Sequence, residues 1–405
     1  MKKIIYLHQY FKFPNENGGT RSFDFSKEFI KNGFNIEIIS LTSDIKYKTK
    51  KRWCKIEKEN IIVNYIYLPY HNKLSSFKRI LIFIQFIYFS TLKILTIKSD
   101  LVIATSTPLT IGIPAIIKKF FHRTPYIFEV RDVWPEAVIA IGAIKNKFII
   151  KSLYFLEKKI YQHSKEIIVL SKDMKKSITH RYSEFKSKTH IIENISEINR
   201  FQNKINPNIN LLESLIGFKP RFSILYAGTF GKVNGINYLI NLASETIKIY
   251  PSIIFILIGE GAEKNEIIEL AKNKNVFNKN VYILDSISKD QLPQLYYECQ
   301  IGSSFVINIK ELWANSANKF FDTLAAGKPI LINYLGWQSD VIKKYDVGYI
   351  LPFEINFNST EEFIKYTIDY KRIEIQNKNS INLAYEKYNL NTLAKKYIQI
   401  INKAI

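Results

Sequence analysis

Short apolar runs alternate with longer amphipathic stretches along the whole chain, and this pattern limits the possible fold more than any other feature. The runs predict strands at residues 4–7, 36–41, 61–68, 101–105, 126–130 and 167–170, and then at 223–227, 253–258, 281–284, 301–306 and 330–333. Strands that alternate with helices form parallel sheets covered by helices on both faces. Two such series predict an α/β fold of two Rossmann-like, doubly wound domains that face a central cleft.

The length of 405 residues exceeds what one hydrophobic core usually supports, so two domains are expected. Asn, Pro and Ser collect within residues 195–220, where we place the join. The expected division is an N-terminal domain (1–200) and a C-terminal domain (201–382), with a last helix at about 383–405 packing back on the first domain. Ligands bind beyond the carboxyl ends of strands in open α/β sheets, so we expect the binding residues in the loops after strands.

The formal net charge of +22 is unevenly placed. Residues 1–200 hold 35 Lys and Arg against 17 Asp and Glu, whereas residues 201–405 hold 23 against 19. This excess favours an anionic partner, which could be nucleic acid, lipid headgroups or a phosphorylated substrate; compositional drift is the alternative. The two cysteines, Cys54 and Cys299, lie far apart, which argues against a disulfide scaffold or a zinc site and fits a reducing cytoplasm. The first apolar run ends at His8 and is too short for a secretory signal.

Two loops of the first half carry candidate binding residues. Gly18 and Gly19 precede a predicted helix, so their backbone amides could approach a phosphate beside Arg21; the alternative is a flexible turn. After the strand at 126–130, Arg131 supplies a cation, Asp132 a base or hydroxyl acceptor, and Trp134 a surface for a sugar ring. A buried Arg131–Asp132 ion pair beside a core Trp134 is the alternative for this loop.

The second half repeats the strand, glycine loop and helix arrangement. Gly228 and Thr229 form a corner that suits a diphosphate, with Lys232 close enough to neutralise it. Gly259 and Gly261 permit either a tight bend or close ligand approach. The run at 315–329 predicts a helix that places three polar side chains near its start, namely Asn318, Lys319 and Asp322. Asn318 and Asp322 share one face, where a carboxylate can accept ribose hydroxyls while the lysine meets phosphate; a surface Lys–Asp pair is the alternative.

The motifs together resemble the retaining glycosyltransferases of family 4, which have the GT-B fold, and in particular the bacterial O-antigen and capsule transferases of the WbuB type. The resemblance covers essentially the whole chain and rests on residues 8–11, 18–21, 131–136, 226–229 and 318–322. It implies that the second domain holds the donor, with Asp322 at the ribose and with Ser286 and Ile287 at the edge of the base. The first acid of the family's Glu-x7-Glu signature is replaced by Ala314. Common members of the family have an Arg and a Lys after the glycine corner, and Thr229 and Asn234 stand at those positions here. Arg131 stands at about the position where many members have a His.

A basic segment and an apolar segment of the first half suggest where the acceptor binds. Lys48, Lys50, Lys51 and Arg52 surround Trp53, and Arg79 precedes the apolar stretch 80–95. Only 13 residues separate Arg79 from Lys93, too few to span a bilayer, so we expect a helix in the membrane surface. A buried core helix beside a solvated loop is the alternative.

The sequence therefore predicts a hexosyltransferase that moves an amino or deoxy sugar from a nucleotide diphosphate, with UDP favoured, to a lipid-linked glycan in surface polysaccharide assembly. Lys232 and Lys319 would stabilise the leaving diphosphate, and Arg131 and Asp132 complete the candidate catalytic set. The resemblance implies retention, with the leaving phosphate as base, and we expect no metal and no other cofactor. The expected partners are the nucleotide sugar, the acceptor and the anionic inner face of the cytoplasmic membrane, without nucleic acid. The alternatives are a sugar-nucleotide epimerase of the same architecture, a non-catalytic protein that binds nucleic acid or an anionic surface, and a lectin-like scaffold.

Overall fold

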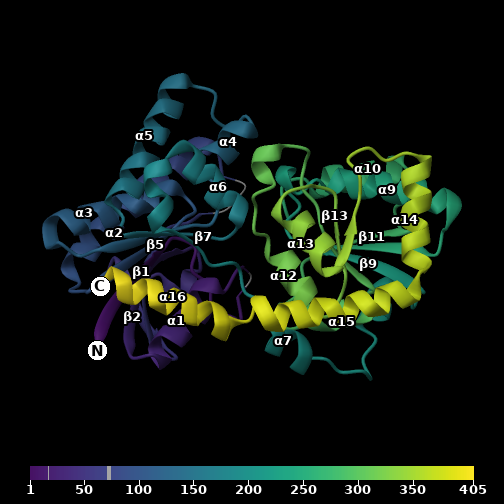
Figure 1. The fold of residues 1–405 in the computed structure, drawn as a ribbon, viewed down its shortest axis with the longest axis horizontal. Coiled ribbons are helices and arrows are strands. Elements are labelled where there is room, and N and C mark those ends of the chain that lie inside the picture. The colour runs from purple at the N-terminus through teal and green to yellow at the C-terminus, as the bar shows by residue number, and fades with distance from the viewer. Residues whose placement is uncertain (17, 71–73) are drawn as a thin grey trace. The chain divides into compact units, whose positions relative to one another are not determined.

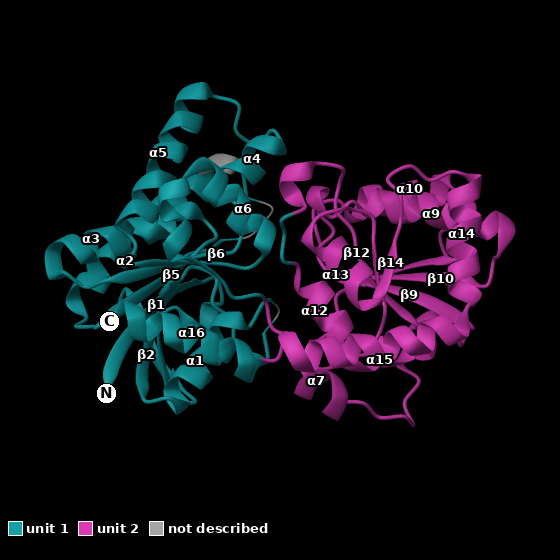
Figure 2. Cartoon of the chain, viewed as in Figure 1, with its two compact units in different colours: residues 1–193, 314–316, 390–405 teal, residues 194–313, 317–389 magenta. Residues whose placement is uncertain are grey.

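The computed structural model describes residues 1–16, 18–70 and 74–405, and the chain divides into two compact units (Figure 2). Unit 1 holds residues 1–193, 314–316 and 390–405, and unit 2 holds residues 194–313 and 317–389. The first boundary falls at 193/194, where the sequence suggested 200/201. The return to unit 1 falls at 389/390, where the sequence suggested about 382/383.

Unit 1 is built on an eight-stranded sheet of order β3-β4-β2-β1-β5-β6-β7-β8 among the described residues (Figure 1). Its strands are β1 (Lys2–His8), β2 (Phe34–Thr42), β3 (Trp53–Lys58), β4 (Ile61–Tyr67), β5 (Leu101–Thr105), β6 (Tyr126–Val130), β7 (Glu166–Val169) and β8 (Thr189–Ile191). All neighbours pair in parallel except β3, which pairs antiparallel with β4. Strands β5, β6 and β7 are buried along their whole length, which explains their largely apolar runs.

Helices cover both faces of this sheet. They are α1 (Arg21–Lys31), α2 (Ser76–Thr96), α3 (Gly112–His122), α4 (Glu136–Ala140), α5 (Lys147–His163), α6 (Lys172–Arg181) and α16 (Leu390–Ala404). Right-handed crossovers place α1 on one face and α2, α3 and α5 on the other, because the chain crosses the sheet in opposite directions at these connections. The last helix, α16, packs on α1, where the ring of Tyr397 lies 5.1 Å from those of Phe25 and Phe29.

Unit 2 contains a parallel six-stranded sheet of order β11-β10-β9-β12-β13-β14. Its strands are β9 (Phe222–Ala227), β10 (Ile253–Ile258), β11 (Val281–Leu284), β12 (Ile301–Ser304), β13 (Ile330–Ile332) and β14 (Gly348–Ile350). Its helices are α7 (Ile198–Asn203), α8 (Leu211–Ile216), α9 (Ile236–Ile249), α10 (Lys264–Asn273), α11 (Leu292–Glu298), α12 (Asn318–Ala325), α13 (Trp337–Tyr345), α14 (Phe357–Ile368) and α15 (Tyr370–Lys387). Two apolar clusters fill the unit: α9, α10 and α14 contribute to one, and α7, α11, α12 and α13 to the other.

The fold class predicted from the alternating pattern is confirmed, and every strand predicted from an apolar run is present. Three strands were missed: β3, β8 and β14. No secondary structure was predicted for the basic segment, but Trp53–Lys58 forms the edge strand β3 after a short 3-10 turn at Ile45–Tyr47. Parallel pairing brings the carboxyl ends of β9, β10 and β11 to one edge of the unit 2 sheet, and this edge positions the first candidate site.

Candidate functional site

Glycines bring the loops after β9, β10 and β12 into backbone contact within unit 2. A Cβ atom at Gly259 would lie 1.8 Å from the carbonyl oxygen of Gly228, and one at Gly261 would lie 2.0 Å from that of Phe230. Gly235 has φ +57°, and its Cβ would lie 2.9 Å from the backbone carbon of Val306. Only glycine fits at these positions, so the glycine motifs serve close approach of strand-end loops.

Lys319 lies at the start of α12 and extends to this glycine corner. Its Nζ atom lies 3.4 Å from Oδ1 of Asn234 and 4.9 Å from the centre of the Tyr226 ring. A Cβ at position 228 would lie 3.1 Å from the same Nζ, so the absence of a side chain at Gly228 leaves room for the ammonium group. Burial lowers the pKa of Lys319 to about 8, because the charged form loses hydration.

Asp322 lies on the same helix, one turn further along. Burial, followed by the nearby Glu197 carboxylate, raises the pKa of Asp322 to about 7, although Lys289, Arg200 and Lys319 act in the opposite direction. The pKa values of Lys319 and Asp322 therefore both move towards neutrality, which is the behaviour of titratable groups at ligand sites. The helix start is also fixed by Asn194, whose amide donates to Oδ1 of Asn318 at 3.2 Å.

A second polar cluster occupies unit 1 behind the carboxyl ends of β1 and β6. The Arg21 side chain donates to Oε2 of Glu129 at 3.1 and 3.2 Å and to the carbonyl oxygen of Ile192 at 2.8 Å. It also donates to the carbonyl of Glu193. Burial opposes ionisation of Glu129, but the charges of Arg21 and Arg131 outweigh it and lower the pKa of this carboxyl.

His8 connects this cluster to Arg131. Its Nδ1 lies 2.9 Å from Oγ of Ser22, and its Nε2 lies 3.2 Å from a terminal nitrogen of Arg131. Burial, followed by the Arg131 charge, holds the pKa of His8 well below its usual value, so the ring is neutral and can accept a hydrogen bond from Arg131. The backbone N–H of Arg131 also donates to Oγ of Ser106 at 2.9 Å. This fixes the strand-end loop that presents the guanidinium.

Two sequence families match consecutive parts of this chain. Glycosyltransferase Family 4 matches residues 18–200, and Glycosyl transferases group 1 matches residues 214–386. The first match lies almost wholly in unit 1 and the second mostly in unit 2, so together they include both polar clusters. The chain is a GT-B glycosyltransferase. Both families transfer glycosyl groups, which makes the chain an enzyme of the hexosyltransferase class.

Relatives of this glycosyltransferase differ in how much of their length is matched. The uncharacterized glycosyltransferase MJ1059 of Methanocaldococcus jannaschii is 28% identical over 251 residues, which are 60% of this chain and 58% of that protein. The Anabaena protein Alr3699/HepE, solved with UDP and glucose, has a TM-score of 0.73 at 14% identity and covers 99% of this chain and 100% of its own. WaaG, a glycosyltransferase involved in lipopolysaccharide biosynthesis, has a TM-score of 0.69 at 13% identity, with coverages of 98% and 99%. Structural similarity at sequence identities of 13% and 14% shows a shared fold.

The structure of the glycosyltransferase brings one group of the predicted donor residues together. Gly228, Gly259, Gly261 and Lys319 meet at the glycine corner, and Thr229 lies exposed beside it with its carbonyl accepting from the amide of Asn234 at 3.0 Å. Asn234 was noted in the sequence only as the replacement of a family cation. Its link to Lys319 across 85 residues is a tertiary contact that spacing does not reveal.

The remaining unit 2 predictions lie on the rim of the corner. Lys232 is exposed in a short 3-10 turn, Lys232–Asn234. Ser286 is exposed and Ile287 half-buried after β11, next to Asp285, which forms an ion pair with Lys264. Their roles in donor binding stay predictions.

Arg21 is the predicted donor residue whose surroundings differ most from expectation. Its guanidinium is only 3% exposed and is bound by Glu129 and two backbone carbonyls, so it serves to tie the start of the linker after β8 to the sheet. Gly18 has φ +134°, and a Cβ there would lie 3.0 Å from Cγ of Lys12, which accounts for a glycine by local geometry. Phosphate binding by Gly18, Gly19 and Arg21 stays a prediction, and the geometry offers Arg21 a structural role.

The loop after β6 presents its polar groups outwards. Asp132 is exposed and accepts from Oγ1 of Thr107 at 2.8 Å, and no Arg131–Asp132 ion pair forms among the described residues. Trp134 is half-buried and packs against the unit 1 core. His8, Glu129 and Glu197 were not selected as site residues from the sequence. His8 does end the first strand, which was an available signal.

Two further features complete the description. No group of three or more His, Cys, Asp or Glu residues that could hold a metal ion occurs in the described part of the chain, and independence from metals stays a prediction.

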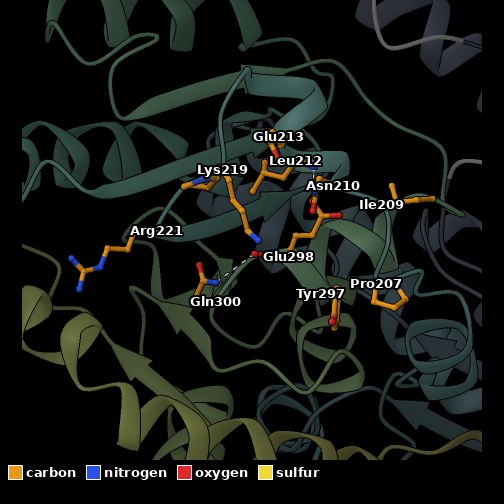
Figure 3. Close-up of a pocket in the computed structure, with 11 residues that line it drawn as sticks. Pro207, Ile209, Asn210, Leu212, Glu213, Lys219, Arg221, Tyr297, Glu298 and Gln300 are labelled. Carbon is orange, nitrogen blue, oxygen red and sulfur yellow. Dashed lines mark hydrogen bonds between the residues drawn. The ribbon is translucent and has the colours of Figure 1, made fainter.

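A cavity of about 650 Å³ lies between residues 207–221 and 297–300 (Figure 3). It sits at the amino ends of β9 and β12, on the sheet edge opposite the glycine corner, and so is separate from the candidate donor site.

Proposed function

We propose that this glycosyltransferase binds a nucleoside-diphosphate sugar, with UDP as the favoured nucleotide, at the glycine corner of unit 2. The observation that supports this most directly is the Lys319 ammonium lodged beside Gly228, in a corner that has no side chains at positions 228, 259 and 261. A diphosphate placed there would meet the half-buried ammonium group of Lys319. The solved complexes of Alr3699/HepE with UDP give the same ligand class on the same fold.

In the proposed reaction, the bond between the sugar and the diphosphate breaks while negative charge collects on the leaving phosphate. Lys319 stabilises that charge in a partly dehydrated setting, where an aligned donor contributes roughly 3 kcal/mol to lowering the barrier. Lys232 is exposed at the rim and adds a longer-range positive field. Asp322 binds the ribose hydroxyls, and hydroxyl donors favour its ionised form, so donor binding would lower its pKa from about 7.

We further propose that the sugar is transferred with retention of configuration, without a metal, and with the leaving phosphate as the base. Arg131 and Asp132 are assigned to the acceptor side, where Arg131 is oriented by the neutral His8. The acceptor is proposed to be a lipid-linked glycan of surface polysaccharide assembly. This pathway is consistent with WaaG, a glycosyltransferase of the same fold that is involved in lipopolysaccharide biosynthesis.

The test of the donor site combines binding and product analysis. Titration calorimetry with UDP and a panel of nucleotide sugars should show binding, and Asp322→Ala should weaken it by roughly 10- to 100-fold through loss of charged hydrogen bonds. Glu386→Ala, which removes an exposed carboxylate of α15, is the matched control and should bind as the wild type does. Unchanged binding in Asp322→Ala would remove this residue from the site. Release of an altered sugar nucleotide without an acceptor product would indicate the epimerase alternative.

The enzyme is proposed to act at the inner face of the cytoplasmic membrane through its basic segment. Arg52 lies 4.0 Å above the ring of Phe89, and Lys93 lies 5.8 Å from the centre of the Trp53 ring, so this segment is anchored to α2. The exposed residues Lys48, Lys50 and Lys51 extend the positive surface. Arg79 is half-buried in the first turn of α2. Replacement of Lys48, Lys50, Lys51 and Arg52 by Ser should release the enzyme from anionic vesicles, and full retention would exclude this anchor.

A further inference from the structure

The outer side of the helices on one face of unit 1 exposes large apolar side chains. On α2, four residues at intervals of four form a stripe in which each side chain is about half exposed: Ile80, Ile84, Tyr88 and Leu92. The opposite side of the same helix is buried in the unit 1 core through Ile82, Phe86 and Ile94. Two opposite sides of α2 are therefore apolar, but only one of them packs in the core.

The neighbouring helices continue this apolar surface. Phe121 near the end of α3 is 76% exposed, and on α5 Phe148 and Phe155 are 84% and 65% exposed. The seven-residue interval between Phe148 and Phe155 places both on one side of α5. Helix α2 packs against α3, and α3 packs against α5 (Figure 1). The rings of Phe120 and His163 lie 5.1 Å apart between α3 and α5. We refer to the outer surface of these three helices as the α2–α3–α5 face.

The charges on this face have one sign. The three helices contain nine Lys and Arg residues and a single acid, Glu157. Glu157 is fully buried and is bound by Arg181 at 2.8 Å and by the hydroxyl of Tyr182 at 2.9 Å. Lys159 lies 5.6 Å from the centre of the Phe155 ring, so cations and exposed aromatic rings are interleaved. A surface that combines exposed Phe rings, Lys side chains and no exposed acid complements an anionic lipid surface.

The stretch Lys78–Thr96 is long and apolar enough to cross a membrane by length and composition, and 22% of it is buried. A spanning helix would have to leave the core that holds Ile82, Phe86 and Ile94, and would carry Lys93 with it. A helix that keeps these contacts can lie in the interface with its other side in the lipid.

We infer that the α2–α3–α5 face docks on an anionic bilayer, with Phe121, Phe148 and Phe155 inserted among the lipid chains. This inference rests on the proposed function in one respect, because a lipid-linked acceptor requires the enzyme at a membrane. It differs from the basic-segment anchor in that the inserted side chains are apolar and lie on α3 and α5, whereas the basic segment precedes and includes β3.

The test is co-sedimentation with vesicles of phosphatidylcholine alone and of phosphatidylcholine with phosphatidylglycerol. The wild-type chain should bind the anionic vesicles. The triple variant Phe121→Ser, Phe148→Ser, Phe155→Ser should bind at least about tenfold more weakly, because three aromatic side chains no longer enter the lipid. The matched control replaces three comparably exposed apolar residues of unit 2, Phe357, Ile375 and Tyr385, by Ser and should bind as the wild type does.

Folding and donor binding are measured on the same variants by thermal unfolding and by calorimetry with UDP. Vesicle binding that is lost in the unit 1 variant, while UDP binding and unfolding temperature are kept, supports the inference. If both variants bind anionic vesicles as strongly as the wild type, the inference is overturned. It is also overturned if the unit 1 variant still binds vesicles but no longer self-associates, because a second copy of the chain would then cover this face. Absence of UDP binding in the wild type would refute the proposed donor site and leave the vesicle result valid.

Discussion

Titration of Lys319 should control donor affinity between pH 7 and pH 9. Burial lowers the pKa of Lys319 to about 8, so about nine-tenths of the side chains carry a proton at pH 7 and about one-tenth at pH 9. The diphosphate binds the protonated form and therefore raises the pKa. Affinity is then fully present below pH 8 and falls as the pH rises through it. The expected loss between pH 7 and pH 9 is about tenfold in the dissociation constant of UDP.

The assay is isothermal calorimetry with UDP in buffers from pH 6.5 to 9.5 at constant ionic strength. Lys319→Met should weaken binding by roughly 10- to 100-fold at pH 7, the usual value of a hydrogen bond to a charged group, and should abolish the pH dependence above pH 7. Lys319→Arg is the control that keeps the cation but does not titrate in this range. Its affinity should not fall between pH 7 and pH 9, because the remaining titration of Asp322, with a pKa of about 7, favours binding as the pH rises.

Two results would refute this reasoning. If Lys319→Met shows the same tenfold loss between pH 7 and pH 9 as the wild type, another group titrates. If the wild-type affinity does not change over this range, the ammonium either keeps an ordinary pKa or does not meet the diphosphate.

Three other substitutions test separate parts of the structure. Arg21→Met should reduce the free energy of unfolding by about 3–5 kcal/mol in urea titrations, because it leaves the carboxylate of Glu129 buried without its partner; a small change would contradict the structural role of Arg21. Arg131→Ala should lower turnover of sugar transfer far more than it lowers the unfolding temperature, and wild-type rates would exclude it from the reaction. Gly259→Ala should cost roughly 1–3 kcal/mol of stability and weaken UDP binding, because its Cβ would lie 1.8 Å from the Gly228 carbonyl; retained UDP affinity would show that the corner is not the donor site.

The elements that the sequence predicted well are those whose pattern has a single physical cause. Ile253–Ile258 is apolar at every position because both faces of β10 are covered, and no other environment of that length fits. Trp53–Lys58 was missed because it is an edge strand with charged residues at alternating positions, and its order depends on pairing with β4. β8 and β14 each have only three residues and depend in the same way on their neighbours.

The sequence indicated which types of residue form the candidate site, but it did not show which other residues they contact. Glycine after a strand signals close approach of backbone, and Gly259 fulfils this with another loop of the protein itself. Arg21 beside two glycines was an equally reasonable phosphate ligand, but its partner Glu129 lies 108 residues away. Sequence spacing cannot show whether a cation will meet a ligand or an acid of the same chain. That depends here on where α1, which carries Arg21, lies relative to β6, which carries Glu129.

Arg21 and Lys319 differ in how far the fold compensates their charge. Arg21 has a carboxylate and two carbonyls in contact, so its charge is compensated within the fold. Lys319 and Asp322 form no ion pair in the described part of the chain. Their pKa values move to about 8 and about 7 because the loss of hydration outweighs the opposite charges nearby. Keeping such groups in a fold costs stability, and a bound diphosphate and ribose would supply the missing partners for both at once. The two charged groups of α12, rather than the ion pair of Arg21 and Glu129 in unit 1, are therefore where a donor would gain the most binding energy.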